Sequence, residues 1–288
     1  MIKPRKMIEK IALIGAGTMG HGIAQVAAQA GFDVVLEDVS EEFVSRGLAR
    51  IRDNLKKGVE RGKVTEDEMH AALSRIQTST NLSDATTADL VIEAVIEKLD
   101  AKRELLAQLD QICKPAAILA TNTSSLSIAS IATATARADR VIGMHFFNPV
   151  HIMKLIEVVI ASETSQETLS AALDVARRMG KEAITVKDAP GFATSRLGVA
   201  LGLEAMRMLE QEVASAEDID KAMVLGYNHP MGPLRLTDLV GLDIRLSIAE
   251  YLFEKLNSEA FRPPDILKRK VAEGKLGKKT GEGFYKWE

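Results

Sequence analysis

The chain has 288 residues, of which 46% are hydrophobic, and a formal net charge of −3 at pH 7. This length fits one large or two modest domains, and the hydrophobic content is ordinary for a globular protein with a substantial core. So small a net charge creates no strong field for nucleic acid or an anionic membrane, and we expect neither as a partner. Any anionic ligand must therefore be bound by a local basic patch.

The single cysteine, Cys113, excludes an intramolecular disulfide and leaves no cysteine cluster for a metal, so we expect no metal site. Its neighbours do not indicate an activated thiolate, and we interpret it as an inert thiol at a helix end. The apolar run that begins at Ile11 is broken at Gly15, unlike the core of a signal peptide. These features predict a cytoplasmic protein.

Strands and helices alternate in the first part of the chain. Residues 10–14 form a short apolar strand, which is followed by a glycine turn, a helix through residue 30 and a valine-rich strand at 32–36. Charged helical segments are expected at 40–62 and 65–73, the second with a capping box from Thr65 to Glu68. Further strands are expected at 90–94, 117–121, 141–145, 155–160 and 183–187. The alternation predicts an α/β fold with a Rossmann-type, doubly wound sheet.

The pattern changes after the segment Asp188-Ala189-Pro190-Gly191. Beyond it only helical periodicity remains, with apolar residues every four positions from Leu197 to Leu209. We therefore predict two domains. Residues 1–187 form a dinucleotide-binding domain with a helical insertion, and residues 188–288 form a smaller all-α domain.

Residues 15–20 read G-x-G-x-x-G and lie between a predicted strand and a predicted helix, the context in which this motif binds a dinucleotide. Gly15 permits the tight turn, Gly17 lets a pyrophosphate approach the backbone, and Gly20 allows the helix to pack closely on the strand. The helix start, with Thr18 and Met19 beside it, offers backbone N–H groups to the anion.

Asp38 ends the second predicted strand, about 20 residues after the glycines, where a carboxylate accepts hydrogen bonds from the adenosine ribose. A carboxylate there repels a 2′-phosphate, and Glu37 beside it adds to that repulsion if it points the same way. This predicts NAD rather than NADP as the cofactor. The alternative is that Asp38 is a turn residue that caps the next helix.

Among five histidines, His145 is the one at the end of a predicted strand, at the sheet edge where open α/β folds bind ligands. Oxidation of an alcohol by hydride transfer needs a base, and a histidine pKa suits that task near neutrality. Glu157 lies twelve residues later in an apolar run, where an acid is costly to bury without a partner. A short connection through Pro149 would let the two segments pair, with Glu157 fixing the imidazole tautomer. The alternative is an edge-strand glutamate that faces water.

The segments 144–150 and 154–158 resemble the signature of the L-3-hydroxyacyl-CoA dehydrogenase family. The glycine motif and the segments 122–126, 188–192, 229–233 and 279–285 also follow the family order, so the resemblance covers essentially the whole chain. Within the family, the chain is most similar to single-function bacterial members that act on 3-hydroxybutyryl-CoA. The resemblance implies NAD-dependent interconversion of a 3-hydroxyacyl-CoA and a 3-ketoacyl-CoA, and a homodimer formed through the helical domain.

The resemblance also implies roles for individual residues. His145 is the expected general acid/base, Glu157 its orienting partner, and Ser124 the group that hydrogen-bonds the reacting oxygen of the substrate. The neighbours of NAD, beyond the glycine motif and Asp38, are expected to be Glu97, Lys102, Asn122 and Asn148.

Basic residues of the helical insertion are expected to bind the phosphates of CoA: Lys56, Lys57, Arg61 and Lys63, with Asn54 on the same side as Arg61. Without the resemblance, a solvated helix face explains this charge run equally well. The chain departs from the family at Ser195, a predicted substrate contact, where members usually carry asparagine. A hydroxyl reaches less far than an amide, which can donate and accept at once.

Two other functions remain open from the sequence. One is an NAD-dependent dehydrogenase that acts on a sugar acid of the gulonate type. The other is a non-catalytic NAD-binding protein on the same scaffold, as lens crystallins of this kind suggest. The basic insertion favours a CoA ester over a sugar acid, and the presence of His145, Glu157 and Ser124 favours catalysis.

Overall fold

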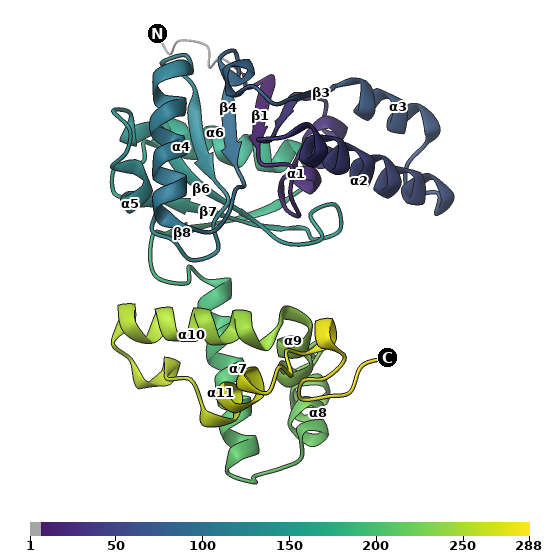
Figure 1. Cartoon of the computed structure of the whole chain (residues 1–288), viewed down its shortest axis with the longest axis vertical. Helices are drawn as coiled ribbons and strands as arrows, with labels where there is room; N and C mark the ends of the chain where they lie inside the picture. The colour runs from purple at the N-terminus through teal and green to yellow at the C-terminus, as the bar shows by residue number, and fades with distance from the viewer. Residues whose placement is uncertain (1–6) are drawn as a thin grey trace. The chain divides into compact units, whose positions relative to one another are not determined.

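A computed structural model describes residues 7–288. Contacts divide the chain after Asp188 into a first unit, which carries the sheet, and a second unit, Ala189–Glu288 (Figure 1). Within the described residues, no helix combines the length and the hydropathy needed to cross a membrane.

The first unit is built on one eight-stranded sheet with the order β3-β2-β1-β4-β5-β6-β7-β8. Neighbouring strands are parallel except for β6 and β7, which are antiparallel. The strands are β1 (Lys10–Ile14), β2 (Asp33–Glu37), β3 (Ile76–Ser79), β4 (Leu90–Glu93), β5 (Ile118–Thr121), β6 (Val141–Phe146), β7 (Leu155–Ile160) and β8 (Glu182–Lys187). The order reverses between β1 and β4, which confirms the doubly wound fold. The sequence did not predict β3, because this short edge strand lacks an apolar run.

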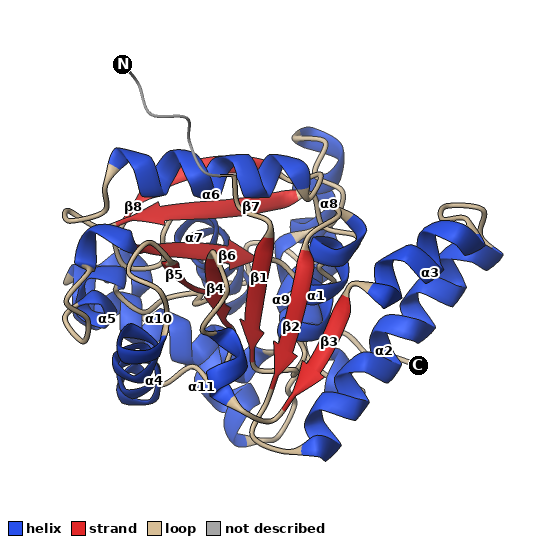
Figure 2. Cartoon of the chain, turned by 90° about the horizontal axis from the view of Figure 1, so that it is seen from above, coloured by secondary structure: helices blue, strands red, loops and turns tan. Residues whose placement is uncertain are grey.

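Helices cover both faces of this sheet (Figure 2). α1 (Gly20–Gln29) and α6 (Gln166–Arg178) share one core with Ile142 and Met144 of β6. α4 (Leu99–Ile112) and α5 (Ile128–Ala132) pack together, and α5 lies over Gly143, where a Cβ would come within 2.8 Å of the Ile128 side chain. Successive side chains of β6 therefore alternate between the two faces, and His145 lies on the same face as Gly143.

The predicted helical insertion consists of α2 (Glu41–Glu60) and α3 (Glu66–Ser74), which extend beside α1 (Figure 1). Thr65 and Glu68 form the expected capping box at the start of α3. α2 packs on the glycine turn, since a Cβ at Gly47 would lie 2.8 Å from the Ala16 carbonyl oxygen. The insertion is thus anchored at the base of the dinucleotide motif.

The second unit is all-α. Its helices are α7 (Thr194–Glu210), α8 (Ala216–Gly226), α9 (Pro233–Val240), α10 (Leu242–Leu256) and α11 (Asp265–Ala272). They enclose a separate core that includes Val199, Leu203, Met206, Leu242 and Leu252. The buried Asp238 carboxylate accepts hydrogen bonds from the backbone N–H groups of Phe284 and Tyr285 and from Nε1 of Trp287. This carboxylate fastens the end of the chain to α9.

Candidate active site

The glycine turn lies at the point where the strand order reverses. Gly15 has φ +99°, and a Cβ there would lie 2.8 Å from the Ala94 carbonyl oxygen, because the loops after β1 and β4 meet at this point. A Cβ at Gly20 would lie 1.7 Å from the Gly15 carbonyl oxygen, so only glycine lets α1 start so close to the turn. A Cβ at Gly17 would meet nothing within 4 Å, and no side chain caps α1 at Met19. The open backbone at Gly17, Thr18 and Met19 fits a pyrophosphate.

Asp38 follows β2 beside this turn. Its carboxylate accepts hydrogen bonds from the backbone N–H groups of Ala16 and Val39, each at 2.7 Å. These bonds hold the acid against the glycine turn rather than at a helix cap, which Ser40 supplies for α2. Glu37 is buried, and burial together with the neighbouring Asp38 charge raises the Glu37 pKa to about 7. Both acids thus lie beside the glycine turn.

His145 and Glu157 face each other across the antiparallel pair β6 and β7. The two residues are register partners, and His145 Nδ1 lies 2.7 Å from Glu157 Oε2. Glu157 is fully buried and His145 is 8% exposed, with its ring tilted against that of Phe147 at a centroid distance of 4.5 Å. A buried carboxylate on Nδ1 orients the ring and fixes its tautomer. Glu157 therefore does not face water, the alternative left open by the sequence.

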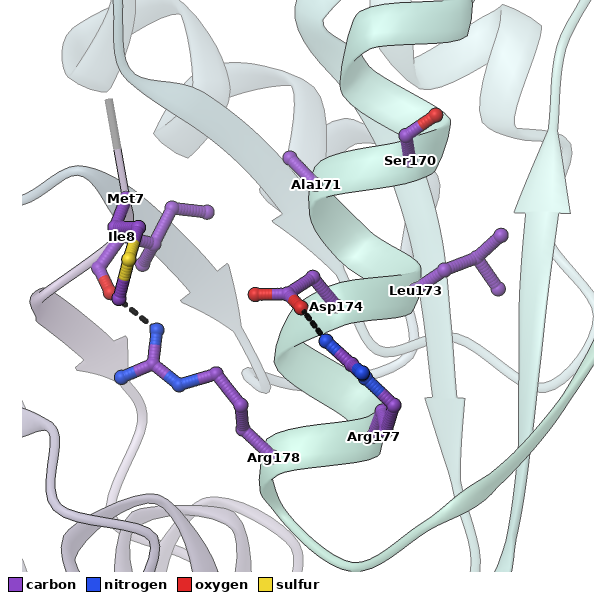
Figure 3. Close-up of a pocket in the computed structure, with 8 residues that line it drawn as sticks. All are labelled: Met7, Ile8, Ser170, Ala171, Leu173, Asp174, Arg177 and Arg178. Carbon is purple, nitrogen blue, oxygen red and sulfur yellow. Dashed lines mark hydrogen bonds and ion pairs between the residues drawn. The ribbon is translucent and has the colours of Figure 1, made fainter. Parts of the chain in front are cut away.

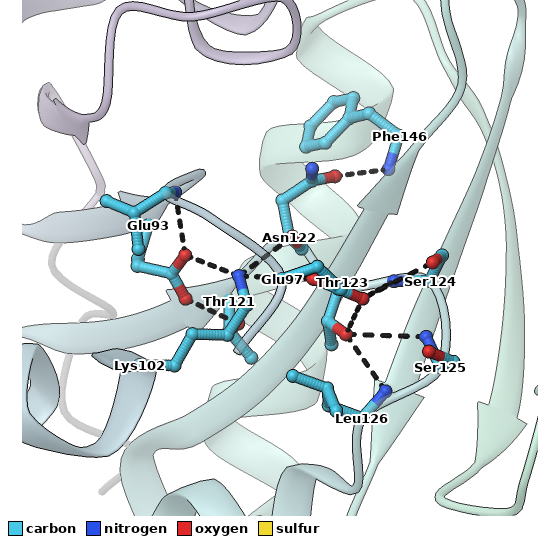
Figure 4. Close-up of polar contacts among 11 residues, drawn as sticks. Glu93, Glu97, Lys102, Thr121, Asn122, Thr123, Ser124, Ser125, Leu126 and Phe146 are labelled. Atoms are coloured by element: carbon cyan, nitrogen blue, oxygen red, sulfur yellow. Dashed lines mark hydrogen bonds and ion pairs between the residues drawn. The ribbon is translucent and has the colours of Figure 1, made fainter. Parts of the chain in front are cut away.

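Ser124 lies in the loop after β5, where Glu97 holds it (Figure 4). One Glu97 carboxylate oxygen accepts hydrogen bonds from Thr123 Oγ1 at 2.5 Å, from Ser124 N at 2.9 Å and from Ser124 Oγ at 3.3 Å. Thr123 Oγ1 in turn accepts from the backbone N–H groups of Ser125 and Leu126. The loop conformation at Ser124 is therefore determined by Glu97 rather than by solvent.

Lys102 forms an ion pair with Glu97. Its side chain is fully buried, and its Nζ lies 2.6 Å from Glu93 Oε1 and 3.4 Å from Glu97 Oε2. Because it is buried, Lys102 acts on the site through these two carboxylates rather than as a group on the surface of the cofactor site. Glu93 also accepts from Thr121 Oγ1 at 2.7 Å and from Val95 N at 2.9 Å. Glu93 was not singled out from the sequence, although it too is an acid within an apolar run, the signal that selected Glu157.

Asn122 connects the two halves of the site. Its side-chain oxygen accepts a hydrogen bond from Phe146 N at 2.9 Å, and its backbone oxygen lies 3.4 Å from Lys102 Nζ (Figure 4). The amide thus joins the loop that carries Ser124 to the end of the strand that carries His145. Asn148 is exposed in the turn after β6, next to the cis peptide bond to Pro149.

The basic residues of the insertion are all exposed, and none of them forms an ion pair within residues 7–288: Lys56, Lys57, Arg61 and Lys63. Asn54 differs from them, since it is partly buried and its amide donates to Gln25 Oε1 of α1 at 3.3 Å. Ser195 belongs to the second unit, where it lies in the first turn of α7.

A pocket of about 550 Å³ lies at the opposite edge of the sheet, before β1 (Figure 3). Its lining contains no histidine and no basic side chain that is free to bind an anion. Its two arginines are already bound, Arg177 to the Asp174 carboxylate and Arg178 to the Ile8 carbonyl oxygen at 2.6 Å. Across the described chain, no group of three or more histidine, cysteine, aspartate or glutamate side chains could hold a metal ion.

A Rossmann-type sheet with this glycine turn and a histidine–carboxylate pair at its carboxyl edge defines an NAD-dependent dehydrogenase. Family models describe both units: "3-hydroxyacyl-CoA dehydrogenase, NAD binding domain" matches residues 10–189, and "3-hydroxyacyl-CoA dehydrogenase, C-terminal domain" matches residues 191–287. The chain belongs to the 3-hydroxyacyl-CoA dehydrogenase family.

Individual relatives agree with the family models. A probable 3-hydroxybutyryl-CoA dehydrogenase of Bacillus subtilis is 48% identical over 281 residues, which are 98% of each chain. The mitochondrial hydroxyacyl-coenzyme A dehydrogenase of Sus scrofa is 44% identical over 98% of this chain and 92% of its own. The crystal structure of (S)-3-hydroxybutyryl-CoA dehydrogenase from Ralstonia eutropha matches with a TM-score of 0.95 and 43% identity, over 98% of this chain and 99% of that one.

Proposed function

We propose that the protein interconverts an (S)-3-hydroxyacyl-CoA with a short acyl chain and the corresponding 3-ketoacyl-CoA, with His145 as the general acid/base. The observation that carries this proposal is the bond between His145 Nδ1 and the buried Glu157 carboxylate. A histidine–carboxylate pair of this kind can remove the proton from a hydroxyl group or return it, and the oxidation of an alcohol requires that step. The names of the relatives supply the substrate class.

Bound NAD supplies the hydride acceptor of the oxidation. The chain's own residues handle the proton: since Nδ1 is bonded to Glu157, the C3 hydroxyl proton passes to Nε2 of His145. The Glu157 carboxylate stabilises the resulting imidazolium, as the charge forms in a buried environment. In the reverse direction the same imidazolium protonates the C3 oxygen as the ketone is reduced.

Ser124 positions the C3 oxygen in this proposal. Its backbone N–H and its hydroxyl both face the Glu97 carboxylate, which restrains the loop before a substrate arrives. A hydroxyl group that is already held in position costs little reorganisation when the reaction occurs. Asn122 and Asn148 are proposed to contact the nicotinamide end, and Glu97 and Lys102 to support it.

The CoA phosphates are proposed to bind the exposed, unneutralised cations of the insertion, Arg61 among them. Four cations without ion pairs on one insertion form a local basic patch in a chain whose net charge is −3. Binding energy from the CoA body, far from the reacting carbon, can then position the acyl group. Asn54 and Ser195 are proposed as further substrate contacts.

A homodimer formed through the second unit is also proposed. Large apolar side chains are exposed on and next to its helices, with exposed fractions of 71% at Leu197, 81% at Leu225 and 75% at Tyr227. Contact with a second copy would remove the apolar surface of these side chains from water.

A cytoplasmic location is also proposed. Cys113 is buried, and burial raises the pKa of its thiol, so the thiol is an unreactive one that suits a reducing compartment.

The direct test follows NADH absorbance after mixing the protein with NADH and acetoacetyl-CoA, with free acetoacetate in parallel. We expect rapid NADH loss with the CoA ester only, and loss of this activity in His145→Ala. Turnover of free hydroxy or keto acids, but not of the ester, would favour a sugar-acid dehydrogenase. Binding of NADH without turnover of any substrate would favour a non-catalytic protein.

A further inference from the structure

Lys181, between α6 and β8, is a partly buried cation that binds backbone carbonyls instead of a carboxylate. Its Nζ donates hydrogen bonds to the carbonyl oxygen of Val150 and, at 2.8 Å, to that of Met153. It forms no ion pair with any residue from 7 to 288. Burial lowers the Lys181 pKa, because an ammonium group loses solvation there. The two carbonyl dipoles of one loop are therefore what compensates this charge.

The backbone of Lys181 is fixed on both sides. α6 ends in a Schellman motif, in which Gly180 has φ +69° and the N–H of Lys181 donates to the Ala176 carbonyl oxygen at 2.9 Å. On the other side, the N–H of Glu182 donates to the Lys154 carbonyl oxygen at 2.9 Å, where β8 begins to pair with β7. The ammonium group thus extends from a rigid base toward the loop.

The loop that Lys181 binds, residues 149–153, has few other anchors. The carbonyl oxygen of Pro149 accepts two backbone N–H groups from within the loop. The one buried side chain of the loop is Val150, which packs so closely on α1 that a Cβ at Gly22 would lie 2.9 Å from its Cβ. Residues 151–153 are exposed. Without the ammonium group, one turn and one apolar contact hold this loop.

We propose that Lys181 is a positioning residue of the reaction, whose ammonium group holds the loop 149–153 and through it orients Asn148 at the nicotinamide end. This inference rests on the proposed function and on Asn148 as a contact of the nicotinamide. Asn148 directly precedes the loop and follows His145 of β6 by three residues. A loop held at Val150 and Met153 therefore limits the orientations of Asn148, and Lys181 acts through that loop rather than on the reacting atoms.

The test is a double-mutant cycle between Lys181 and Asn148, with kcat measured on NADH and acetoacetyl-CoA. We expect Lys181→Met and Asn148→Ala each to lower kcat by about 10- to 100-fold, the usual size of a small misplacement near the reaction. The double variant should lie within about threefold of the weaker single variant, because both changes remove the same contact. The dissociation constant for NADH should change less than about threefold in each variant, since the glycine turn is unaltered. Lys187→Met, which removes an exposed ammonium group from β8, is the matched control and should keep the native kcat.

Chemical rescue tests whether the ammonium group itself is required. In Lys181→Cys, the thiolate displaces bromide from 2-bromoethylamine and yields a side chain of lysine length with a sulfur in place of one methylene group. The native cysteine, Cys113, is buried, and the native protein treated in parallel shows whether it reacts. Once mass spectrometry shows a single added group, we expect kcat to recover at least about 5-fold over untreated Lys181→Cys, up to the loss expected for a misplaced group. No recovery would overturn the inference.

The remaining outcomes separate the two proposals. If the native protein does not reduce acetoacetyl-CoA, the proposed function fails. If it does, but the effects of Lys181→Met and Asn148→Ala multiply in the double variant, Lys181 only stabilises the chain and the inference is overturned. An unchanged kcat in either single variant also overturns it. If Lys181→Met does not fold, Lys181→Gln takes its place in the cycle, because its amide can still donate to one of the two carbonyls.

Discussion

Lys102 and Glu93 form an ion pair in which both side chains are fully buried, with 2.6 Å between Nζ and Oε1. The pair lies directly beneath Glu97, the carboxylate that holds the Ser124 loop. Lys102 therefore pairs with two carboxylates, the buried Glu93 and Glu97 beside the Ser124 loop. The position of Ser124 depends in this way on a charge pair that no substrate touches.

Removal of one partner of this pair should destabilise the first unit strongly. Lys102→Met leaves the Glu93 carboxylate buried and uncompensated, which costs about 3–5 kcal/mol when a buried pair is broken. The double variant Lys102→Met/Glu93→Leu should recover most of that loss, since no buried charge remains. The urea midpoint of the transition that reports the sheet measures both effects. Equal midpoints for the single and the double variant would contradict the interpretation.

The same pair should also affect catalysis through Glu97. In the double variant, the fold is expected to be intact but Glu97 loses its only described cation, so Ser124 is less well restrained. We expect kcat with acetoacetyl-CoA to fall by about 10- to 100-fold, the usual size for loss of a supporting group. The dissociation constant for NADH, measured by fluorescence, should change much less. An unchanged kcat would show that Ser124 does not need this support.

Glu157→Gln should lower activity while preserving the fold. The amide still reaches His145 Nδ1 but cannot stabilise an imidazolium and can favour the wrong tautomer, so kcat should fall by about 10²–10⁴-fold. The binding of NADH should remain within about twofold of the native value, because Glu157 lies beside β6 rather than beside the glycine turn. Activity above half of the native kcat would remove Glu157 from the proposed dyad.

Asp38→Asn should weaken the discrimination against NADPH. The amide oxygen can still accept one of the two backbone hydrogen bonds made by Asp38, so the turn keeps its shape while the negative charge is lost. We expect the ratio of kcat/KM for NADPH to that for NADH to rise by about 10-fold, equivalent to about 1.4 kcal/mol. Ser40→Ala, which removes the α2 cap without changing any charge, is the control and should leave the ratio unchanged.

The sequence was sufficient to predict the strands of the sheet core and the pairing of His145 with Glu157. Three local features carried these predictions: the apolar strands, the spacing of the glycines, and Glu157 within an apolar run. Each reflects a local energetic requirement that can be recognised without coordinates. β3 and the role of Lys102 could not be predicted in this way. A polar edge strand is defined by its neighbour β2, and a lysine on a charged helix is ordinarily exposed.

Arg245 of α10, which is 7% exposed, shows why the surroundings of some residues cannot be predicted from the sequence. Its surroundings depend on Gly198, on a different helix, and the one-dimensional pattern contains no signal that pairs an arginine with a distant glycine. The proximity of Gly198 to Arg245 becomes apparent only when α7 and α10 are seen to pack together. Long-range packing between helices, rather than local propensity, determines the surroundings of such a residue.

Glu37 should make stability decrease as the pH rises. Its carboxyl has a pKa of about 7 in the folded protein, mainly because of burial and then because of the Asp38 charge, against about 4.5 when unfolded. The folded state therefore binds more protons than the unfolded state between these values, and the free energy of unfolding falls with pH across that window. Well below pH 4.5 the group is protonated in both states, and above about pH 8 the loss is complete.

Glu37→Gln removes this titration and should raise the free energy of unfolding at pH 8 by about 1–3 kcal/mol relative to the native chain, with little difference at pH 4.5. Urea unfolding at several pH values measures the difference, and Glu60→Gln, at an exposed glutamate of α2, serves as the control. A stabilisation that is equal at both pH values would mean that the amide improves packing rather than relieving a buried charge. A gain that grows between pH 5 and 7 would mean that the folded protein retains an acid of high pKa beside Asp38.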